Sequence, residues 1–508
     1  MATSLMQTYA NTDFLYDNKR FMKIQTVSDF SATIQALIIP VQLETLEPTL
    51  AVLTEQTAVP LALLQAEVTG KKGEIQTFFT TTGLRIYVLG LGTNPGSGEI
   101  IKAFRSLVFK NKDKLPETLG VDLSTLPAAW AEFVVNGIWL ASYNFGLYKT
   151  DEVKPSPLFS GTLELRHSED LSDFIQKGEI LAKTQLRVFP LLNAPANFKT
   201  PQTLASWAMH SGDAHGFKVR VYDAGECQSL GLMALLAVGQ GSRNEPEFIV
   251  MEYEGTGASQ TVALVGKGVT FDTGGISIKP SENMHLMKSD MGGAAAVLGT
   301  MEAVARLKLP VRLIGIVPTT ENSVDGESMK PGDVITSYAG KTIEVTDTDA
   351  EGRLILADGL AYAIKNFNPD VVIDLATLTG SIIRTLGYHA AGMFTENNSL
   401  GKQLKRAGEH TGERLWRLPM WEAYADHLKS DVADIRNFSG LPHSQAIAAA
   451  KFLEVFTNEH PAWVHLDIAG TAYGDTDFAP QRAGTAYGVR LLVEFLEQLV
   501  SEEASATV

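Results

Sequence analysis

The feature that most constrains the fold is an alternation, in the second half of the chain, of short apolar runs with helical patterns. The apolar runs are rich in Val and Ile, which is typical of buried strands, and the segments between them have helical periodicity. The expected strands are 261–265, 311–317, 342–346 and 370–375, and the expected helices are 292–309 and 352–365. Such alternation predicts a largely parallel sheet covered by helices on both faces, and therefore an α/β fold.

Polar residues of this half fall where the expected strands end. In open α/β sheets, ligands bind where loops leave the carboxyl ends of the strands. We expect a glycine-rich loop after the strand at 261–265, with Lys267 and Asp272 in it. The candidate functional residues in this region are Lys267, Asp272, Lys279, Asp290, Asp349, Glu351 and Arg353.

The first third of the chain has no such concentration of chemically useful residues. It mixes apolar runs such as 34–41 with helical patterns such as 97–110. Residues 164–186 have the pattern of an amphipathic helix, and Pro195 and Pro201 break any helix that follows. Because a chain of 508 residues is too long for a single hydrophobic core of ordinary size, we expect two domains. The predicted parts are a smaller N-terminal α/β domain at 1–163, a linker helix at 164–187 and a larger C-terminal catalytic domain at 188–508.

Composition disfavours several classes of function. With 58 acidic and 42 basic residues, the net charge of -16 repels nucleic-acid phosphates and anionic membranes. No stretch approaches the ~18 apolar residues that span a bilayer. The single cysteine, Cys227, excludes an intramolecular disulfide. The N-terminal segment lacks an apolar signal-peptide core and contains Asp13 and Asp17, so we expect a cytoplasmic protein that binds neither membrane nor nucleic acid.

If the candidate residues converge, their charges need compensation. Four carboxylates in one pocket raise one another's pKa, and two divalent cations would balance them. Oxygen ligands suit Mn²⁺ or Mg²⁺, and Zn²⁺ also accepts carboxylates. Two metals about 3.5–4 Å apart polarise a carbonyl and lower the pKa of a bridging water, which predicts a hydrolytic centre. Lys279 and Arg353 are then left to bind anionic species.

Each candidate also has an ordinary structural interpretation. Asp290 before a helix is commonly an N-cap, and Asp349 or Glu351 near a helix start favours the helix dipole. The segment from Asp347 imitates a calcium-binding loop, but Asp358 stands where a bidentate Glu belongs. The sequence has no GxSxG elbow, no HExxH motif and no P-loop. Together, at the ends of expected strands, the candidates favour a functional site.

Several sequence blocks resemble one known family. DTDAEGRL at 347–354 is very similar to the NTDAEGRL signature of the leucyl aminopeptidases, also called cytosol aminopeptidases. Four further blocks match that family in order: VGKGVTFDTGGISIKP, KSDMGGAAAV, DLATLTG and HLDIAGTAY. The match covers roughly the C-terminal two thirds of the chain and is highly specific. The N-terminal third resembles the variable domain of the family only weakly.

The resemblance implies a set of metal ligands for two divalent ions, Zn²⁺, Mn²⁺ or Mg²⁺. Asp272 and Glu351 would each contact both metals. Lys267 and Asp290 would complete the site that receives the substrate's amino group, and Asp349 would complete the other site. A lysine can serve as a ligand because a neighbouring dication lowers its pKa and frees its lone pair.

Two further residues have catalytic roles by the same resemblance. Lys279 would stabilise the tetrahedral intermediate, and Arg353 would hold a bicarbonate ion that serves as general base. The implied reaction is hydrolysis of the first peptide bond of a peptide with a free N-terminus, by a water that two metals activate. The resemblance also implies a homohexamer.

A substrate pocket follows from the resemblance as well. The predicted substrate-binding residues are Met287, Thr377, Leu378, Gly380, Ala469 and Ala472. Leu378 and Gly380 would supply main-chain hydrogen bonds, and the others would surround the first side chain. Walls of Met and Ala favour an apolar residue such as Leu, although plain core packing is the ordinary interpretation of each.

The sequence departs from the family pattern at two places. Asp347 replaces the usual Asn of the signature, which adds a negative charge beside the metals and removes an amide donor. Ser444, Gln445 and Ala446 stand where many members have Gly-Gly-Ala. Two other functions remain as alternatives: a DNA-binding regulatory role, which the net charge opposes, and a two-metal phosphoesterase, which the block order opposes.

Overall fold

The computed structural model describes residues 21–146, 148–150, 155–474, 477–479 and 481–506. The N-terminal residues 1–20, from which the absence of a signal peptide is predicted, lie outside the described residues. The described chain forms two compact units, one ending at Leu186 and the other beginning at Arg187. The domain ranges 1–163, 164–187 and 188–508 stay a prediction. Within the described part, none of the helices has the length and apolar character of a membrane span.

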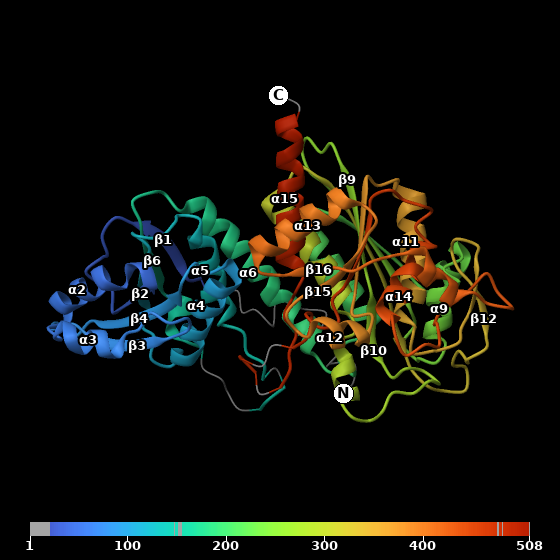
Figure 1. The fold of residues 1–508 in the computed structure, drawn as a ribbon, viewed down its shortest axis with the longest axis horizontal. Helices are drawn as coiled ribbons and strands as arrows, with labels where there is room; N and C mark the ends of the chain where they lie inside the picture. Colours follow the sequence, from blue (N-terminus) through green and yellow to red (C-terminus); the bar gives the residue numbers. More distant parts are fainter. Residues whose placement is uncertain (1–20, 147, 151–154, 475–476, 480, 507–508) are drawn as a thin grey trace. The chain divides into compact units, whose positions relative to one another are not determined.

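The N-terminal unit contains a six-stranded sheet of order β1-β6-β5-β2-β4-β3 (Figure 1). Its strands are β1 (Lys23–Val27), β2 (Ala36–Gln42), β3 (Ile75–Phe79), β4 (Arg85–Gly92), β5 (Thr118–Asp122) and β6 (Thr162–Arg166). Its helices are η2 (Leu43–Thr45), α2 (Leu46–Thr57), α3 (Leu61–Glu67), α4 (Ser97–Asn111), α5 (Trp130–Leu140) and η3 (Pro157–Ser160). All neighbouring strands are parallel except β3 and β4. The apolar run at 34–41 and the helical pattern at 97–110 correspond to β2 and α4.

The helix predicted from residue 164 is partly wrong. Residues 162–166 form strand β6, and helix α6 (Ser172–Asn193) begins only at Ser172. The sequence TLELR alternates apolar and polar residues, which is the period of a strand. Glu164 is buried and accepts a hydrogen bond from the Ser31 backbone N–H at 2.9 Å. The sequence of this strand can be mistaken for one face of a helix because, over only a few residues, the hydrophobic period of a strand and that of a helix give similar patterns.

The C-terminal unit is built on a nine-stranded sheet of order β16-β15-β18-β14-β9-β11-β8-β7, with β10 paired to β11. The strands are β7 (Lys218–Tyr222), β8 (Glu247–Glu254), β9 (Thr261–Gly266), β10 (Gly268–Asp272), β11 (Arg312–Asn322), β14 (Val371–Ala376), β15 (Ala391–Phe394), β16 (Leu415–Arg417) and β18 (Trp463–Asp467). The central strands β18, β14, β9 and β11 are parallel, and β15, β8 and β7 join antiparallel. A small sheet holds β12 (Val334–Thr336), β13 (Thr342–Glu344) and β17 (Ile435–Arg436).

Helices cover both faces of the central strands, as their full burial requires. The helices and 3-10 turns of this unit are α7 (Pro201–His215), α8 (Ala224–Leu230), α9 (Met233–Gly239), η4 (Met284–Ser289), α10 (Gly292–Leu307), α11 (Gly352–Phe367), α12 (Gly380–Leu386), α13 (Asn398–Thr411), η5 (Glu422–Leu428), α14 (Gln445–Glu454) and α15 (Val489–Ala506). Helix α10 packs with α7 and α15, whereas α11 packs with α9 and α14. The predicted α/β fold with a mostly parallel, helix-covered sheet is confirmed.

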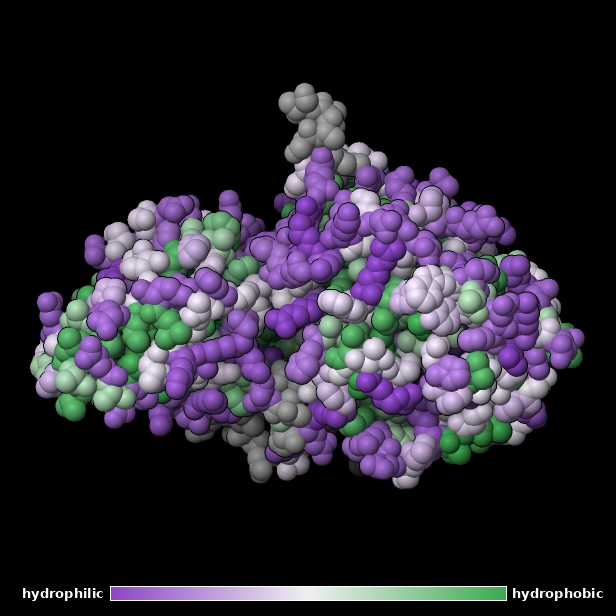
Figure 2. Space-filling view, viewed as in Figure 1, coloured by the Kyte–Doolittle hydropathy of each residue, from purple (hydrophilic) through white to green (hydrophobic). Residues whose placement is uncertain are grey.

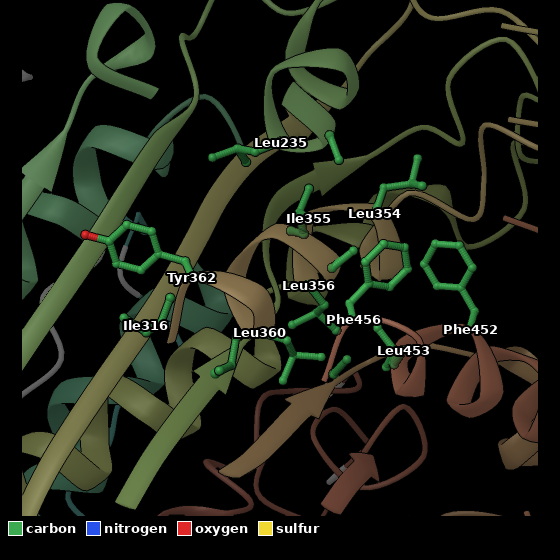
Figure 3. Close-up of a cluster of buried hydrophobic side chains, with 14 of the residues drawn as sticks. Leu235, Ile316, Leu354, Ile355, Leu356, Leu360, Tyr362, Phe452, Leu453 and Phe456 are labelled. Carbon is green, nitrogen blue, oxygen red and sulfur yellow. The ribbon is translucent and has the colours of Figure 1, made fainter. Parts of the chain in front are cut away.

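Helix α11, which follows the DTDAEGRL segment, is anchored by an extensive apolar core (Figure 3). Its residues Leu354 and Leu360 are fully buried, together with Leu235 of α9 and Phe452 of α14. Truncating a buried leucine of this kind to alanine costs about 2–5 kcal/mol. The helix start that carries the candidate residues is therefore held on a rigid support.

The first turn of α10 also approaches the sheet closely. A Cβ atom on Gly293 would lie 1.9 Å from the carbonyl oxygen of Leu375, and one on Gly266 would lie 2.5 Å from the carbonyl oxygen of Gly293. Only glycine fits at such distances. The contact brings the residues just before α10 against the ends of β9 and β14.

The face of the described chain that Figure 2 shows is mixed in character. Hydrophilic side chains cover much of the face in view, and apolar side chains are scattered between them. Singly exposed apolar residues are ordinary on a protein surface, so this face gives no reason to look for the functional site outside the strand ends.

Candidate metal centre

Three buried carboxylates converge at the carboxyl ends of the central strands. Asp272 is the last residue of β10, Asp290 follows η4, and Glu351 directly precedes α11. One carboxylate oxygen from each lies within 4.8 Å of the others. Their charges are close enough to repel strongly in a buried site, so cations must compensate them.

The expectation that Lys267 and Asp272 lie in a loop is corrected by strand β10. Residues Gly268–Asp272 pair in parallel with β11, and Lys267 is the single residue between β9 and β10. The glycines around this strand concealed its β character in the sequence. Pairing in a sheet fixes Asp272 more firmly than a loop would.

The ammonium group of Lys267 lies among these carboxylates. Its Nζ atom is 2.7 Å from Asp290 Oδ2 and 2.8 Å from Glu351 Oε1, and it donates to the carbonyl oxygen of Thr377 at 3.1 Å. Burial acts to lower the pKa of Lys267, but Asp290, Glu351 and Asp272 outweigh it and raise that pKa. Lys267 is thus a cation in the structure described, and it occupies the space between predicted ligands.

The donor atoms around Lys267 fit a divalent cation. Asp290 Oδ2 and Glu351 Oε1 are within ion-pair distance of Nζ, yet within the described residues neither receives a well-directed hydrogen bond. Buried carboxylate oxygens without hydrogen bonds are costly unless another partner satisfies them. Two such oxygens beside an amine nitrogen form a mixed oxygen and nitrogen donor set that Mn²⁺ and Zn²⁺ accept.

A second lysine joins Asp349 to the same cluster. Lys279 Nζ lies 2.7 Å from Asp272 Oδ2 and forms an ion pair with Asp349 Oδ1. Burial opposes the charge of Lys279, but Asp272, Glu351 and Asp349 raise its pKa. Burial and the neighbouring carboxylates Asp272 and Glu351 raise the pKa of Asp349 to about 7, against the opposing effect of Lys279. All five predicted ligands therefore meet in one network.

Arg353 lies in the first turn of α11 and is buried. Its Nη1 donates to the carbonyl oxygen of Asn437 at 2.8 Å, whereas its Nε has no partner among the described residues. Burial lowers the pKa of Arg353 to about 10, and Glu351 and Asp347 act in the opposite direction. A buried guanidinium with an unused N–H can bind an anion.

The ordinary interpretation of Asp290 as an N-cap does not hold, whereas Cys227 is an ordinary buried thiol. Met291, not Asp290, is the residue that precedes α10 as its N-cap. Glu351 occupies the N-cap position of α11, but its side chain makes no capping hydrogen bond. Cys227 is buried, and burial raises its pKa to about 12, so it is not a nucleophile at neutral pH.

Sequence reasoning missed two asparagines that support the cluster. Asn322 ends β11 opposite Asp272, and its Nδ2 donates to Asp272 Oδ1 at 2.8 Å and to the carbonyl oxygen of Thr348 at 3.0 Å. The polar residue at the end of a strand was an available signal, but the predicted strand stopped at residue 317, short of it. Asn437 lies in a segment with no predicted role, and no sequence pattern around it indicates a functional residue.

Asn437 shapes the DTDAEGRL segment. Its Oδ1 accepts from the backbone N–H of Thr346 at 2.9 Å, and its Nδ2 donates to the carbonyl oxygens of Asp347 at 2.6 Å and Ala350 at 3.3 Å. Asp347 in turn accepts from the Asp349 backbone N–H through Oδ1 at 2.9 Å. An acceptor oxygen is present in both Asp and Asn, which explains how Asp347 can stand in for the Asn of the family signature.

Three of the predicted pocket residues contact Asp290 or pack around Gly292. Thr377 donates through Oγ1 to Asp290 Oδ1 at 2.7 Å. A Cβ on Gly292 would lie 2.8 Å from the Ala472 side chain and 3.0 Å from that of Thr377, so these residues pack together. Met287 belongs to η4, and its carbonyl oxygen accepts from the Asp290 backbone N–H at 3.2 Å.

The second departure from the family pattern has a conformational explanation. Ser444 has a φ of 57°, in the left-handed region where glycine is favoured. Glycine at this place in many members would relieve that strain. Gln445 begins α14 and accepts a hydrogen bond from Arg384 of α12 at 3.3 Å.

Comparison with known proteins places this geometry in a family. The model of the cytosol aminopeptidase family catalytic domain matches residues 188–493. The chain belongs to the cytosol aminopeptidase family. It is 41% identical over 495 residues to a probable cytosol aminopeptidase of Chloroherpeton thalassium, covering 92% of this chain and 97% of the relative. It is 43% identical over 452 residues to another from Chlorobium phaeobacteroides, covering 84% and 90%.

Solved structures agree with this membership. A mutant of tomato leucine aminopeptidase matches with a TM-score of 0.85 and 34% identity, covering 94% of this chain and 97% of that one. The bottromycin maturation enzyme BotP in complex with Mn matches with a TM-score of 0.81 and 32% identity, covering 92% and 100%. The resemblance inferred from the sequence blocks is therefore confirmed for this cytosol aminopeptidase family member.

Proposed function

We propose that this cytosol aminopeptidase family member hydrolyses the N-terminal bond of peptides with a free N-terminus at a centre of two divalent metals. The observation that supports this most directly is the convergence of Asp272, Asp290 and Glu351 within 4.8 Å around the buried amine of Lys267. The related enzyme BotP has been solved in complex with Mn, which supports a divalent ion in this chain as well.

The metals would be held by Lys267, Asp272, Asp290, Asp349 and Glu351. When bound, they would polarise the scissile carbonyl and lower the pKa of a water. Mn²⁺ and Zn²⁺ both suit this set of oxygens and one nitrogen, and Mg²⁺ suits the carboxylates.

Other residues would do the remaining work. Lys279, on the Asp272 and Asp349 side of the cluster, is placed to stabilise negative charge that develops on the carbonyl oxygen. Arg353, with its unused Nε, would hold a bicarbonate ion as general base. Leu378 and Gly380 would align the peptide backbone.

The pocket chemistry supports a preference for apolar first residues such as Leu. Met287, Thr377, Ala469 and Ala472 offer methyl and thioether surface and no charge. The names of the relatives support action in the cytosol, and we propose a homohexamer by family membership. No described feature favours a DNA-binding role or a phosphoesterase.

Hydrolysis of leucyl-p-nitroanilide tests the proposal. We expect release of p-nitroaniline with Mn²⁺ or Zn²⁺, loss of release on chelation, and recovery when metal is returned. Metal content per chain, measured by plasma mass spectrometry, should be two. Inactivity on this substrate with every divalent metal, or hydrolysis of p-nitrophenyl phosphate instead, would overturn the proposal.

A further inference from the structure

A buried carboxylate outside the metal cluster connects two loops of the predicted substrate pocket. Asp467, the last residue of β18, is fully buried. Its Oδ1 accepts from the backbone N–H of Leu378 at 3.1 Å and from that of Ala469 at 3.2 Å. Its Oδ2 accepts from the hydroxyl of Thr379 at 2.7 Å. One side chain therefore binds the loop after β14 and the loop after β18.

No close ion pair in the described part of the chain accounts for the position of this carboxylate. Within the described residues, no lysine, arginine or histidine nitrogen forms an ion pair with Asp467. Burial raises the pKa of Asp467, while the neighbouring His465 and the hydrogen bonds from Thr379, Ala469 and Leu378 oppose that rise. A buried carboxylate is costly, and hydrogen-bond donors from these two loops offset part of that cost.

The hydrogen bonds of Asp467 decide which backbone groups of the first loop are free. The Leu378 N–H is already used, so only its carbonyl oxygen is available to a substrate. The Thr379 hydroxyl donates to Asp467 and accepts from the Ile382 N–H at 3.3 Å, which fixes the start of α12 at Gly380. Within the described residues, neither the Leu378 carbonyl nor the Gly380 N–H has a hydrogen-bond partner.

We propose that Asp467 is a positioning residue that aligns the Leu378 carbonyl and the Gly380 N–H with the peptide backbone of the substrate, and ties them to the pocket wall at Ala469. The proposal rests on the proposed function, because it assumes that a peptide binds there. It sharpens the role of Leu378, which offers its carbonyl oxygen rather than its N–H.

Asp467→Asn tests this with little change of shape. The amide oxygen can still accept from Leu378 and Ala469, but the amide nitrogen cannot accept from Thr379. We expect KM for leucyl-p-nitroanilide to rise about tenfold, the effect of one lost hydrogen bond, with a smaller change in kcat and an unchanged content of Mn²⁺. Thr379→Val removes the same bond from the other side, so the double variant should be no worse than either single one. Thr379→Ser should retain wild-type KM.

Asp358→Asn is the matched control. Asp358 is equally buried and also accepts from backbone N–H groups, among them those of Leu235 at 3.0 Å and Tyr338 at 2.8 Å, and these residues do not belong to the predicted pocket. We expect this variant to lower the unfolding temperature and leave KM unchanged.

A measurement independent of turnover completes the test. Hydrogen exchange of a peptide containing residues 377–382 should accelerate in Asp467→Asn, with metal bound. If Asp467→Asn has wild-type KM and exchange, or affects only the unfolding temperature as Asp358→Asn does, the inference is wrong. Loss of Mn²⁺ from Asp467→Asn would also overturn it. Inactivity of the wild-type protein would instead refute the proposed function.

Discussion

Asn322 offers the sharpest test of how the protein holds its metal ligands. Asn322→Ala removes two hydrogen bonds with separable consequences. The bond from Nδ2 to Asp272 Oδ1, at 2.8 Å, orients a predicted ligand of both metals. The bond to the Thr348 carbonyl, at 3.0 Å, supports the fold of the segment that carries Asp349 and Glu351. Among the described residues, Asp272 Oδ1 would keep only the Gly274 N–H as a hydrogen-bond donor.

The two losses have different magnitudes. Removing a residue that orients a metal ligand lowers metal affinity about 10- to 100-fold. The neutral bond to Thr348 contributes about 0.5–1.5 kcal/mol to the free energy of unfolding. We therefore expect weaker Mn²⁺ binding, measured by competition with a fluorescent chelator, and a modest loss of stability in urea without metal.

Asn244→Ala is the matched control for this experiment. Asn244 also donates through Nδ2 to a carboxylate, Glu321 Oε2, at 3.0 Å, and Glu321 is not a predicted ligand. Its loss should leave Mn²⁺ affinity unchanged. An Asn322→Ala variant with affinity within about twofold of wild type would refute the orienting role, because the expected loss is at least about tenfold.

Other groups of the C-terminal unit give further measurable expectations. Lys279→Ala should lower kcat by about 100-fold or more, because Lys279 is proposed to stabilise charge that develops on the carbonyl oxygen. The metal content should stay unchanged, and loss of metal would contradict this role of Lys279. Arg353→Ala should abolish any stimulation of kcat by added bicarbonate, whereas a variant still stimulated would exclude Arg353 as the anion site. Because the pKa of Asp349 is raised to about 7 before metal binds, Mn²⁺ binding should release more protons at pH 6 than at pH 8, as calorimetry in buffers of different ionisation enthalpy can measure. Burial also raises the pKa of Glu247 to about 7. The protonated Glu247 side chain therefore contributes its full stability below the unfolded pKa near 4.5, and this contribution is lost as the pH rises toward 7. Glu247→Gln should gain stability relative to wild type across that pH window, and a difference in stability that stays constant with pH would disprove this expectation.

The fold was predictable from the sequence where one period dominated. The strands β9, β11 and β14 and the helices α10 and α11 are long or strongly apolar, and each lies close to its predicted place. The prediction for the segment TLELR was wrong because five residues are too few to distinguish the period of a strand from one side of a helix. Strand β10 was not predicted because the glycines that flank it are typical of loops.

Some residues of the candidate site were also predictable from the sequence, and others were not. Lys267, Asp272 and Asp290 were found because charged residues in a glycine-rich region between strands are unusual, and the family blocks then supplied their roles. The side chains of Asn437 and Asp467 bind backbone groups about ninety positions away, at separations of 87 to 91 for Asn437 and 89 for the bond from Leu378 to Asp467. No local pattern encodes such a contact. Side chains that bind remote backbone are visible only after the chain is folded.

The separation of the site in sequence has a consequence for the order of folding. Asp272 and Asn322 are 50 positions apart, and Lys267 and Thr377 are 110 apart. Both contacts exist only after β9, β11 and β14 have paired, and closing such long loops is slow because their entropy is lost before the contacts form. A metal that needs this whole arrangement binds after the rate-limiting step of folding. It would therefore slow unfolding without accelerating folding, so that a newly made chain competes for metal only once its sheet is complete.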